Sequence, residues 1–271
     1  MPGNNVQSLA IACSAGGFKG VFVHGALSAL EAAGVHVDAY AAASSSVFPS
    51  ICAAIRQADE VGLRYWRGAL QTLKQPGNGM SEVVLRSISE SGPVLFNLLF
   101  QPVAPRFIVG ARFFIATSAI KTAAGAEQTQ GDGARRLGRR LLLSAARGDR
   151  SWVDEHLQAY LFDSAAPDEE HRLTIDNINE VIYASTRMLH AWTIPALVAG
   201  RPYVLHLCLS RAGNGSARIC RGDSYSYRTR TIVPGHFSQR ANPRRLAGYI
   251  DPCDPTRPGP RRDGCWLYGY D

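Results

Sequence analysis

The first 57 residues repeat one pattern twice, and this pattern restricts the fold more than any other feature of the chain. Each unit is a short apolar run, a loop of small residues, and then an apolar segment with helical spacing. The runs cover residues 7–13 and 35–43, and the helical segments cover 21–34, ending at Gly34, and 47–57. Strands and helices that alternate through short loops predict a mostly parallel sheet flanked by helices, which is an α/β fold.

Later segments extend this pattern less regularly. Residues 112–122 and 201–209 are predicted strands, and residues 133–162 are predicted to form two helices with basic faces. Residues 174–192 are predicted to be a helix capped by Thr174 or Asp176. The segment 76–105 combines proline, glycine and apolar clusters, so we expect it to be irregular.

The charge of the chain lies mostly in its last part. Residues 205–271 contain eleven Arg and five Asp, with no Lys or Glu, so they carry +6 of the net charge of +7. We therefore divide the chain into a folded domain over 7–204 and a poorly ordered basic tail over 205–271. The arginines of residues 133–162 are interpreted as a solvated helix surface, because aromatic residues are not interleaved with them as in a single-strand groove, and we expect no nucleic-acid partner.

The remaining composition argues for a cytoplasmic protein without a cofactor. No run of 18 apolar residues appears, and the N-terminus has no basic start before an apolar stretch. Without an export signal we expect no disulfides among the six cysteines. They include no C-x-x-C pair and no common zinc spacing, so we expect no metal site.

A glycine loop follows the first predicted strand. Gly16, Gly17 and Gly20 in "SAGGFKG" allow backbone N–H groups to point into a concave anion site. The loop lacks the G-K-[ST] of a phosphate-binding Walker loop, and its glycine spacing differs from that of a dinucleotide-binding loop.

A run of serines follows the second predicted strand. Ser44 stands in "AASSS", between the strand and the next helix, where a sharp turn lifts a serine out of the sheet toward a helix N-terminus. The usual frame is G-x-S-x-G, and here Ala42 and Ser46 occupy the glycine positions. A helix-capping role for these serines is the alternative interpretation.

Taken together, these segments resemble the patatin-like phospholipase family. The shared features are "GGFKG", Gly25 in the following helix, and Val37-Asp38 six residues ahead of Ser44. Two later segments, "FFIATSAIKT" and "YASTRMLHAWTIPALVAGRPYV", are also similar to the family, so that the resemblance covers about residues 8–204.

This resemblance implies a three-layer hydrolase fold and assigns roles to residues. Ser44 would be the nucleophile, and the backbone of Gly16, Gly17 and Phe18 would form the oxyanion hole. Lys19 would take the basic position of the loop, ahead of Gly20. The implied substrates are lipid acyl esters, which would bring a peripheral contact with a membrane surface.

The base that the family uses is missing from its expected position. The resemblance implies a Ser–Asp dyad, but Leu205 stands where the aspartate belongs, in "YVLHLC". His206 and Asp132 are the remaining candidates for a base, and Asp38 is expected to be structural. We therefore expect weak or no activity, and the alternative is an inactive patatin-fold protein that binds lipid or a protein partner.

An apolar segment offers one candidate for substrate contact. The residues from Val94 to Leu99 would cover an acyl chain or pack in the core.

The unusual tail suggests a genetic origin for the missing aspartate. Residues 218–243 can be encoded by codons that, read one nucleotide later, spell GYAGVIAIATEPGPLYRDIFHSERIP, which contains a buried-strand run. We hypothesise that the chain leaves an ancestral reading frame near residue 205. The gene sequence tests this: the hypothesis is wrong if no intact continuation in the shifted frame lies between the codon for Val204 and the stop.

Overall fold

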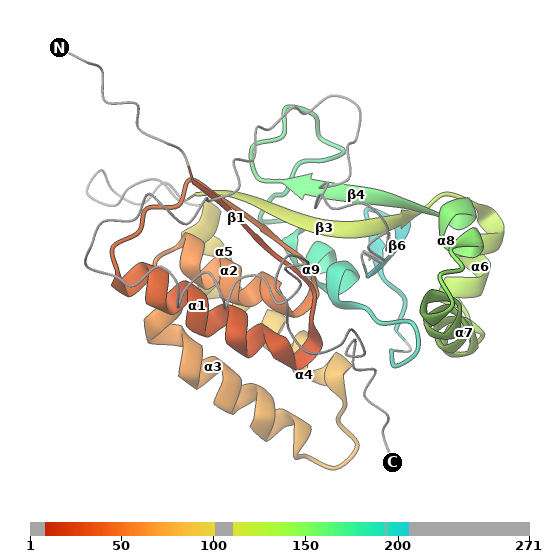
Figure 1. The fold of residues 1–271 in the computed structure, drawn as a ribbon, viewed down its shortest axis with the longest axis horizontal. Coiled ribbons are helices and arrows are strands. Elements are labelled where there is room, and N and C mark those ends of the chain that lie inside the picture. The colour runs from red at the N-terminus through yellow and green to blue at the C-terminus, as the bar shows by residue number, and fades with distance from the viewer. Residues whose placement is uncertain (1–8, 101–110, 193, 206–271) are drawn as a thin grey trace, which may run out of the picture.

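A six-stranded mixed sheet forms the centre of the protein (Figure 1). The computed structural model describes residues 9–100, 111–192 and 194–205, and the figures draw the others in grey. The strand order is β1-β2-β3-β6-β5, and β4 pairs with β3 as well. The strands are β1 (Ala10–Cys13), β2 (Ala39–Ala42), β3 (Arg112–Ile120), β4 (Leu157–Asp163), β5 (Leu197–Val198) and β6 (Arg201–Leu205).

The prediction of an α/β fold is confirmed, but the prediction of a mostly parallel sheet is not. The β1–β2 and β2–β3 pairs are parallel, as the repeated strand–loop–helix unit predicts. The β3–β4, β3–β6 and β5–β6 pairs are antiparallel. The sheet formed by the described residues is therefore mixed.

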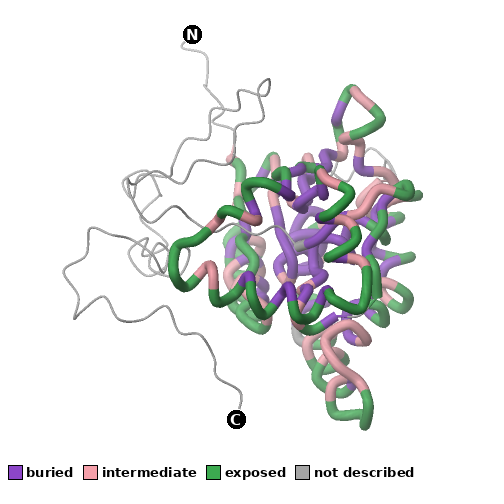
Figure 2. The backbone as a smooth tube through the Cα atoms, turned by 90° about the vertical axis from the view of Figure 1, so that its right-hand side faces the viewer, coloured by how far each residue is buried: buried purple, intermediate pink, exposed green. Residues whose placement is uncertain are grey.

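Most helices cover one face of this sheet. The helices are α1 (Gly20–Ala32), α2 (Val47–Ala54), α3 (Ala58–Leu73), α4 (Met80–Glu90), α5 (Gly92–Phe100), α6 (Ala123–Gln130), α7 (Ala134–Ala146), α8 (Ser151–His156) and α9 (Ile178–Thr186). In Figure 1, α1 to α5 and α9 lie on one side of the strands, and α6 to α8 gather at one end. Buried residues concentrate where the sheet meets these helices (Figure 2).

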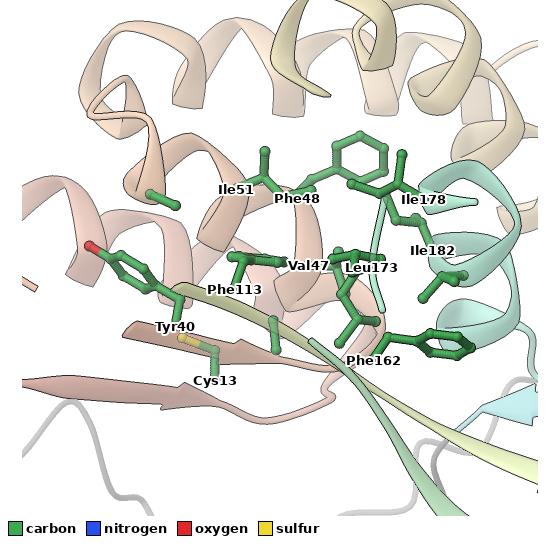
Figure 3. Close-up of a cluster of buried hydrophobic side chains, with 14 of the residues drawn as sticks. Cys13, Tyr40, Val47, Phe48, Ile51, Phe113, Phe162, Leu173, Ile178 and Ile182 are labelled. Carbon is green, nitrogen blue, oxygen red and sulfur yellow. The ribbon is translucent and has the colours of Figure 1, made fainter. Parts of the chain in front are cut away.

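The main core lies between the sheet and the helices α2 and α9. Phe113 and Ile115 of β3 are fully buried, as are Val47 and Ile51 of α2. Figure 3 shows side chains from α2 and α9 pointing toward the strands. Each such side chain stabilises the fold by about 1.5–3 kcal/mol relative to an exposed one. This core holds the ends of β1 and β2 in place.

A second, smaller core lies at the far end of the sheet. It joins Ile120 of β3 and Val204 of β6 to Leu137 and Leu141 of α7. Because neighbouring residues of a strand face opposite sides, Val204 lies on the sheet face opposite Tyr203, which belongs to the main core. Both faces of the sheet are thus packed, although the second face is packed over a smaller area.

The helices α1 and α3 are antiparallel and joined by a buried histidine. His24 Nε2 lies 2.8 Å from the carbonyl of Ala58, and the indole of Trp66 donates to His24 Nδ1 at 3.0 Å. An indole N–H only donates, so Nδ1 accepts and the proton sits on Nε2. Burial lowers the pKa of His24, in agreement with a neutral ring. His24 stands in the first half of α1 and contacts the start and the middle of α3. The second half of α3 therefore extends beyond the start of α1.

The boundary of α1 confirms its predicted end. Gly34 has a φ of 71°, a left-handed conformation that glycine adopts without strain. Its N–H donates to the carbonyl of Glu31, and the N–H of Val35 donates to that of Leu30. This pair of hydrogen bonds is a Schellman motif, a common ending of α-helices.

Three predictions of secondary structure were wrong in part. The segment 76–105 is not irregular where the structure describes it, because α4 and α5 occupy most of it. Residues 133–162 contain the helices α7 and α8, but the segment from Leu157 onward forms β4. The helix predicted over 174–192 is the shorter α9, preceded by a turn in which Thr174 and Asn177 exchange side-chain bonds.

Some predictions fall outside the described residues. They include the tail beyond Leu205, the candidate base His206 and the cysteines at 208, 220, 253 and 265. Cys13 and Cys52 are free and buried. Within the described part of the chain, no single helix is long and apolar enough to cross a membrane; α4 and α5 pass that test only as a pair bent by 57°.

Candidate active site

The glycine loop and the serine run leave the sheet side by side. The strands β1 and β2 are parallel, and their last residues, Cys13 and Ala42, lie opposite each other. The segments that follow therefore emerge at the same edge, the carboxyl edge of the parallel strands. Ligands of open α/β sheets bind at this edge.

Ser44 forms a sharp turn between β2 and α2. Ala43 is extended, with φ −141° and ψ 142°, and Ser44 then has a φ of 55°. The chain continues as a 3₁₀ turn over Ser44–Ser46 and directly into α2. A serine in the left-handed region at a strand-to-helix turn has the backbone geometry of a nucleophile elbow. The residue is 7% exposed, so only a small part of it reaches solvent.

Ser46 fixes this turn to the end of β1. Its hydroxyl lies 2.8 Å from the carbonyl of Cys13 and 2.7 Å from that of Ala43, and it accepts the N–H of Ala43 at 3.2 Å. The N–H of Ala43 also approaches the Cys13 carbonyl at 3.2 Å. The serine at this position, where the family has glycine, is thus fully buried and satisfied.

Ser185 of α9 holds the turn from the other side. Its hydroxyl accepts the N–H of Ser44 at 2.9 Å and donates to the carbonyl of Ala116 in β3 at 2.8 Å. Sequence analysis gave Ser185 no role, although it stands in the "YAS" of the segment that resembles the family. A contact between residues 141 positions apart leaves no local pattern that would indicate it.

The glycine loop forms a short helical turn beside the turn at Ser44. Gly17–Lys19 form a 3₁₀ turn, and Gly17 has a φ of 54°, which favours glycine. The first N–H groups of a helical turn have no carbonyl partner within it, and here they belong to Gly17 and Phe18. The N–H of Lys19 donates to Gly16. Phe18 and Lys19 are exposed, so the loop lies at the protein surface.

Gly20 brings the loop and the serine turn into contact. A Cβ atom at position 20 would lie 2.7 Å from the backbone oxygen of Ser45 and 3.0 Å from the ring of Trp66. No side chain fits there. The structure thus brings the predicted loop residues next to the segment that contains Ser44.

Position 205 lies close to Ser44 along the same edge of β3. Thr117 pairs with Tyr160 of β4 and with Leu205, so β6 lies on the edge of β3 opposite β4. Ile115 likewise pairs with Phe162 of β4 and with Ala42 of β2, so β2 also lies on the edge of β3 opposite β4. The two strands meet head-on, and positions 42 and 205 are about 6–7 Å apart along β3. The position where the family has its aspartate therefore adjoins the elbow.

Other candidate groups are not brought to this site. Asp38 lies just before the first residue of β2, at the end of the strand away from Ser44. There its carboxylate accepts the N–H of Leu9 at 2.7 Å, so its expected structural role is confirmed. Asp132 lies exposed in the turn between α6 and α7, in the loop position expected for a residue without a catalytic role. Within the described residues, no carboxylate or imidazole hydrogen-bonds to Ser44.

Cys13, at the end of β1 beside the candidate site, does not act as a second nucleophile. Burial raises the pKa of the Cys13 thiol, so this cysteine stays protonated and is no nucleophile.

Leu95 and Phe96 are buried in the main core, whereas Val94 is 63% exposed. The segment Val94–Leu99 therefore contributes mostly to core packing. Among the described residues, no three His, Cys, Asp or Glu side chains could hold a metal ion.

Comparison with known proteins adds no family to this geometry: no family model, no curated protein and no solved structure matches the chain. The functional argument therefore rests on the residues and their contacts.

The strain at Ser44 predicts an unusual order of stability. Replacing Ser44 with Gly should give a protein more stable than Ser44→Ala by about 1 kcal/mol, because alanine is disfavoured at positive φ. Urea unfolding of both variants measures the difference. Ser45, which has no positive φ, is the control: there the alanine variant should be the more stable one. Equal stability of Ser44→Gly and Ser44→Ala would contradict a strained turn.

The contact at Gly20 predicts opposite effects for two glycines of α1. Gly20→Ala should lower the free energy of unfolding by about 1–3 kcal/mol, because the new methyl group meets the backbone of Ser45. Gly25→Ala should raise it by up to about 1 kcal/mol, because a Cβ there meets nothing within 4 Å. Denaturant titration distinguishes the two. A Gly20→Ala variant as stable as Gly25→Ala would show that the loop does not pack on the serine turn.

Proposed function

We propose that this protein is a patatin-like serine acyl-ester hydrolase with low turnover. The observation that carries the proposal is the left-handed Ser44 at the turn between β2 and α2. It lies beside a glycine loop whose first amides have no carbonyl partner within their own 3₁₀ turn. Strained backbone of this kind clusters at active sites. The finer assignment of the fold to the patatin-like three-layer architecture is part of the same proposal, supported by packing on both faces of the sheet.

The proposed reaction follows from the positions of these groups. The Ser44 oxygen attacks the ester carbonyl and forms a tetrahedral intermediate, whose negative oxygen accepts hydrogen bonds from the amides of the glycine loop. The N-terminus of α2 also favours this charge. Collapse of the intermediate breaks the bond to the alkoxide, which takes a proton from water and leaves as the alcohol. The acyl group stays on Ser44 until water hydrolyses this ester and regenerates the serine.

The weakness of the reaction follows from position 205. Leucine cannot take the proton of Ser44, and a missing general base typically costs about 10²–10⁴ in rate. The serine proton passes instead to water. The amides and the orientation of the serine remain, and these groups alone supply part of the rate enhancement of serine hydrolases.

Lipid acyl esters are the proposed substrates. The resemblance implies them, and the exposed Phe18 within the glycine loop supports them, since this side chain is 53% exposed beside the reacting groups. We propose a peripheral membrane contact on the same grounds, and no cofactor.

The same leucine favours a second candidate function. A protein that keeps the loop and the turn but has lost its base would bind lipid without hydrolysing it. This silent lipid-binding domain differs from the hydrolase only in the reactivity of Ser44.

Ester hydrolysis by the wild type and three variants tests the proposal. The wild type should hydrolyse a short-chain p-nitrophenyl ester slowly, and Ser44→Ala should lose this activity and its labelling by a fluorophosphonate probe. Leu205→Asp should raise turnover by about 10²-fold or more, because a carboxylate then adjoins the elbow.

Leu205→Asn is the matched control for the aspartate variant. It has the same size and no base, so its turnover should stay at the wild-type level. Labelling of the wild type that persists in Ser44→Ala would refute the hydrolase. A wild type that is neither labelled nor active would leave the silent domain as the function.

A further inference from the structure

One end of the protein beside the candidate site exposes large apolar side chains. Phe18 of the glycine loop and Val21 and Phe22 of α1 are 53%, 44% and 65% exposed. Leu70 of α3 is 52% exposed and lies one turn beyond Trp66, which contacts Gly20. Because α1 and α3 are antiparallel, Leu70 lies at the end of α1 that carries the loop (Figure 1). We call Phe18, Val21, Phe22 and Leu70 the apolar lip.

The outer side of α1 is unusual for a helix on a protein surface. Its exposed residues include Val21, Phe22, Gly25 and Ala29, and the helix contains no charged residue before Glu31. A helix that is apolar all round is normally covered on every side. Water-exposed apolar area of this kind marks a surface that binds a partner.

Within the two segments that carry the apolar lip, residues 14–30 and 61–81, the charged residues are positive. Lys19 stands between Phe18 and the start of α1, and Arg67 and Lys74 of α3 are exposed at the same end. No acidic residue occurs in residues 14–30 or in residues 61–81. The next acid along the chain, Glu82, accepts the N–H of Gly79 at 2.7 Å and the hydroxyl of Ser81 at 2.9 Å.

We propose that the apolar lip docks on an anionic lipid surface and presents the ester to Ser44. Aromatic and aliphatic side chains enter the boundary between headgroups and acyl chains, and the surrounding cations contact anionic headgroups. Phe18 belongs to both the lip and the glycine loop, so docking places the loop amides against the lipid esters. The choice of a lipid surface rests on the proposed function, whereas the location of the surface rests on exposure and charge.

Vesicle co-sedimentation tests the docking surface. The full-length wild type should bind mixed phosphatidylcholine–phosphatidylglycerol vesicles more strongly than pure phosphatidylcholine vesicles, and added salt should weaken the difference. The double variant Phe22→Ser/Leu70→Ser should bind the mixed vesicles roughly tenfold more weakly or worse, because two apolar side chains no longer leave water. Arg67→Glu/Lys74→Glu should lose the preference for the anionic vesicles.

The variant Leu142→Ser/Leu143→Ser is the matched control. These leucines of α7 are 41% and 62% exposed next to arginines, at the other end of the sheet (Figure 1). This variant should bind vesicles as the wild type does. Equal losses in Phe22→Ser/Leu70→Ser and in Leu142→Ser/Leu143→Ser would overturn the proposal, and so would a wild type that does not bind. A dimer that Phe22→Ser/Leu70→Ser dissociates, with unchanged vesicle binding, would assign the lip to a second copy of the chain instead.

Two further measurements separate this proposal from the proposed function. Ser44→Ala should bind vesicles like the wild type, and Phe22→Ser/Leu70→Ser should hydrolyse a soluble short-chain ester at the wild-type rate. Vesicle binding without any serine-dependent turnover would refute the hydrolase and retain the docking surface. Serine-dependent turnover without vesicle binding would refute the docking surface and retain the hydrolase.

Discussion

The left-handed backbone at Ser44 is the constraint on which the rest of the site depends. Along one edge of β3 the strands β2 and β6 meet head-on, and Ser185 bridges the meeting point by accepting from Ser44 and donating to Ala116. On the other side Ser46 binds the end of β1. A left-handed residue other than glycine costs about 1–2 kcal/mol, so it persists only where its surroundings hold it. Here a helix and two strands do so through serine hydroxyls.

The fold could be predicted where apolar spacing and turn residues agree. The elements from β1 to α2 were found because strands, glycine loops and amphipathic spacing alternate clearly. The helices α4 and α5 were missed because glycine and proline suggested a loop. Gly79 instead caps the start of α4, and Pro93 lies in the first turn of α5, where no N–H donor is needed. The strand β4 was missed because Leu157 directly follows α8, with no turn residue between them.

The candidate site could be predicted only in its local part. Ser44 and the glycine loop are visible because sharp turns require small residues close together in the chain. Ser185 and the position of residue 205 relative to Ser44 depend on strand register and on contacts across the sheet, which no local pattern contains. The parallel sheet was extrapolated from the first two units, and the antiparallel pairings of β3 with β4 and β6 also depend on such long-range register.

The structure assigns a capping role to Ser46, whose hydroxyl accepts the N–H of Ala43, but not to Ser44. A capping serine has extended backbone, and its hydroxyl accepts an N–H of the first helical turn. Ser44 has a φ of 55°, and within the described residues its side chain makes no such bond. The extended residue that precedes the turn is Ala43, whose N–H is satisfied by Ser46. Capping therefore does not account for the strain at Ser44. The left-handed serine beside the glycine loop is the arrangement on which the proposed acyl transfer depends. Under the proposed function, the leucine at position 205 limits the rate of that chemistry, whereas the position of the candidate site depends on the turn at Ser44 and on the glycine loop.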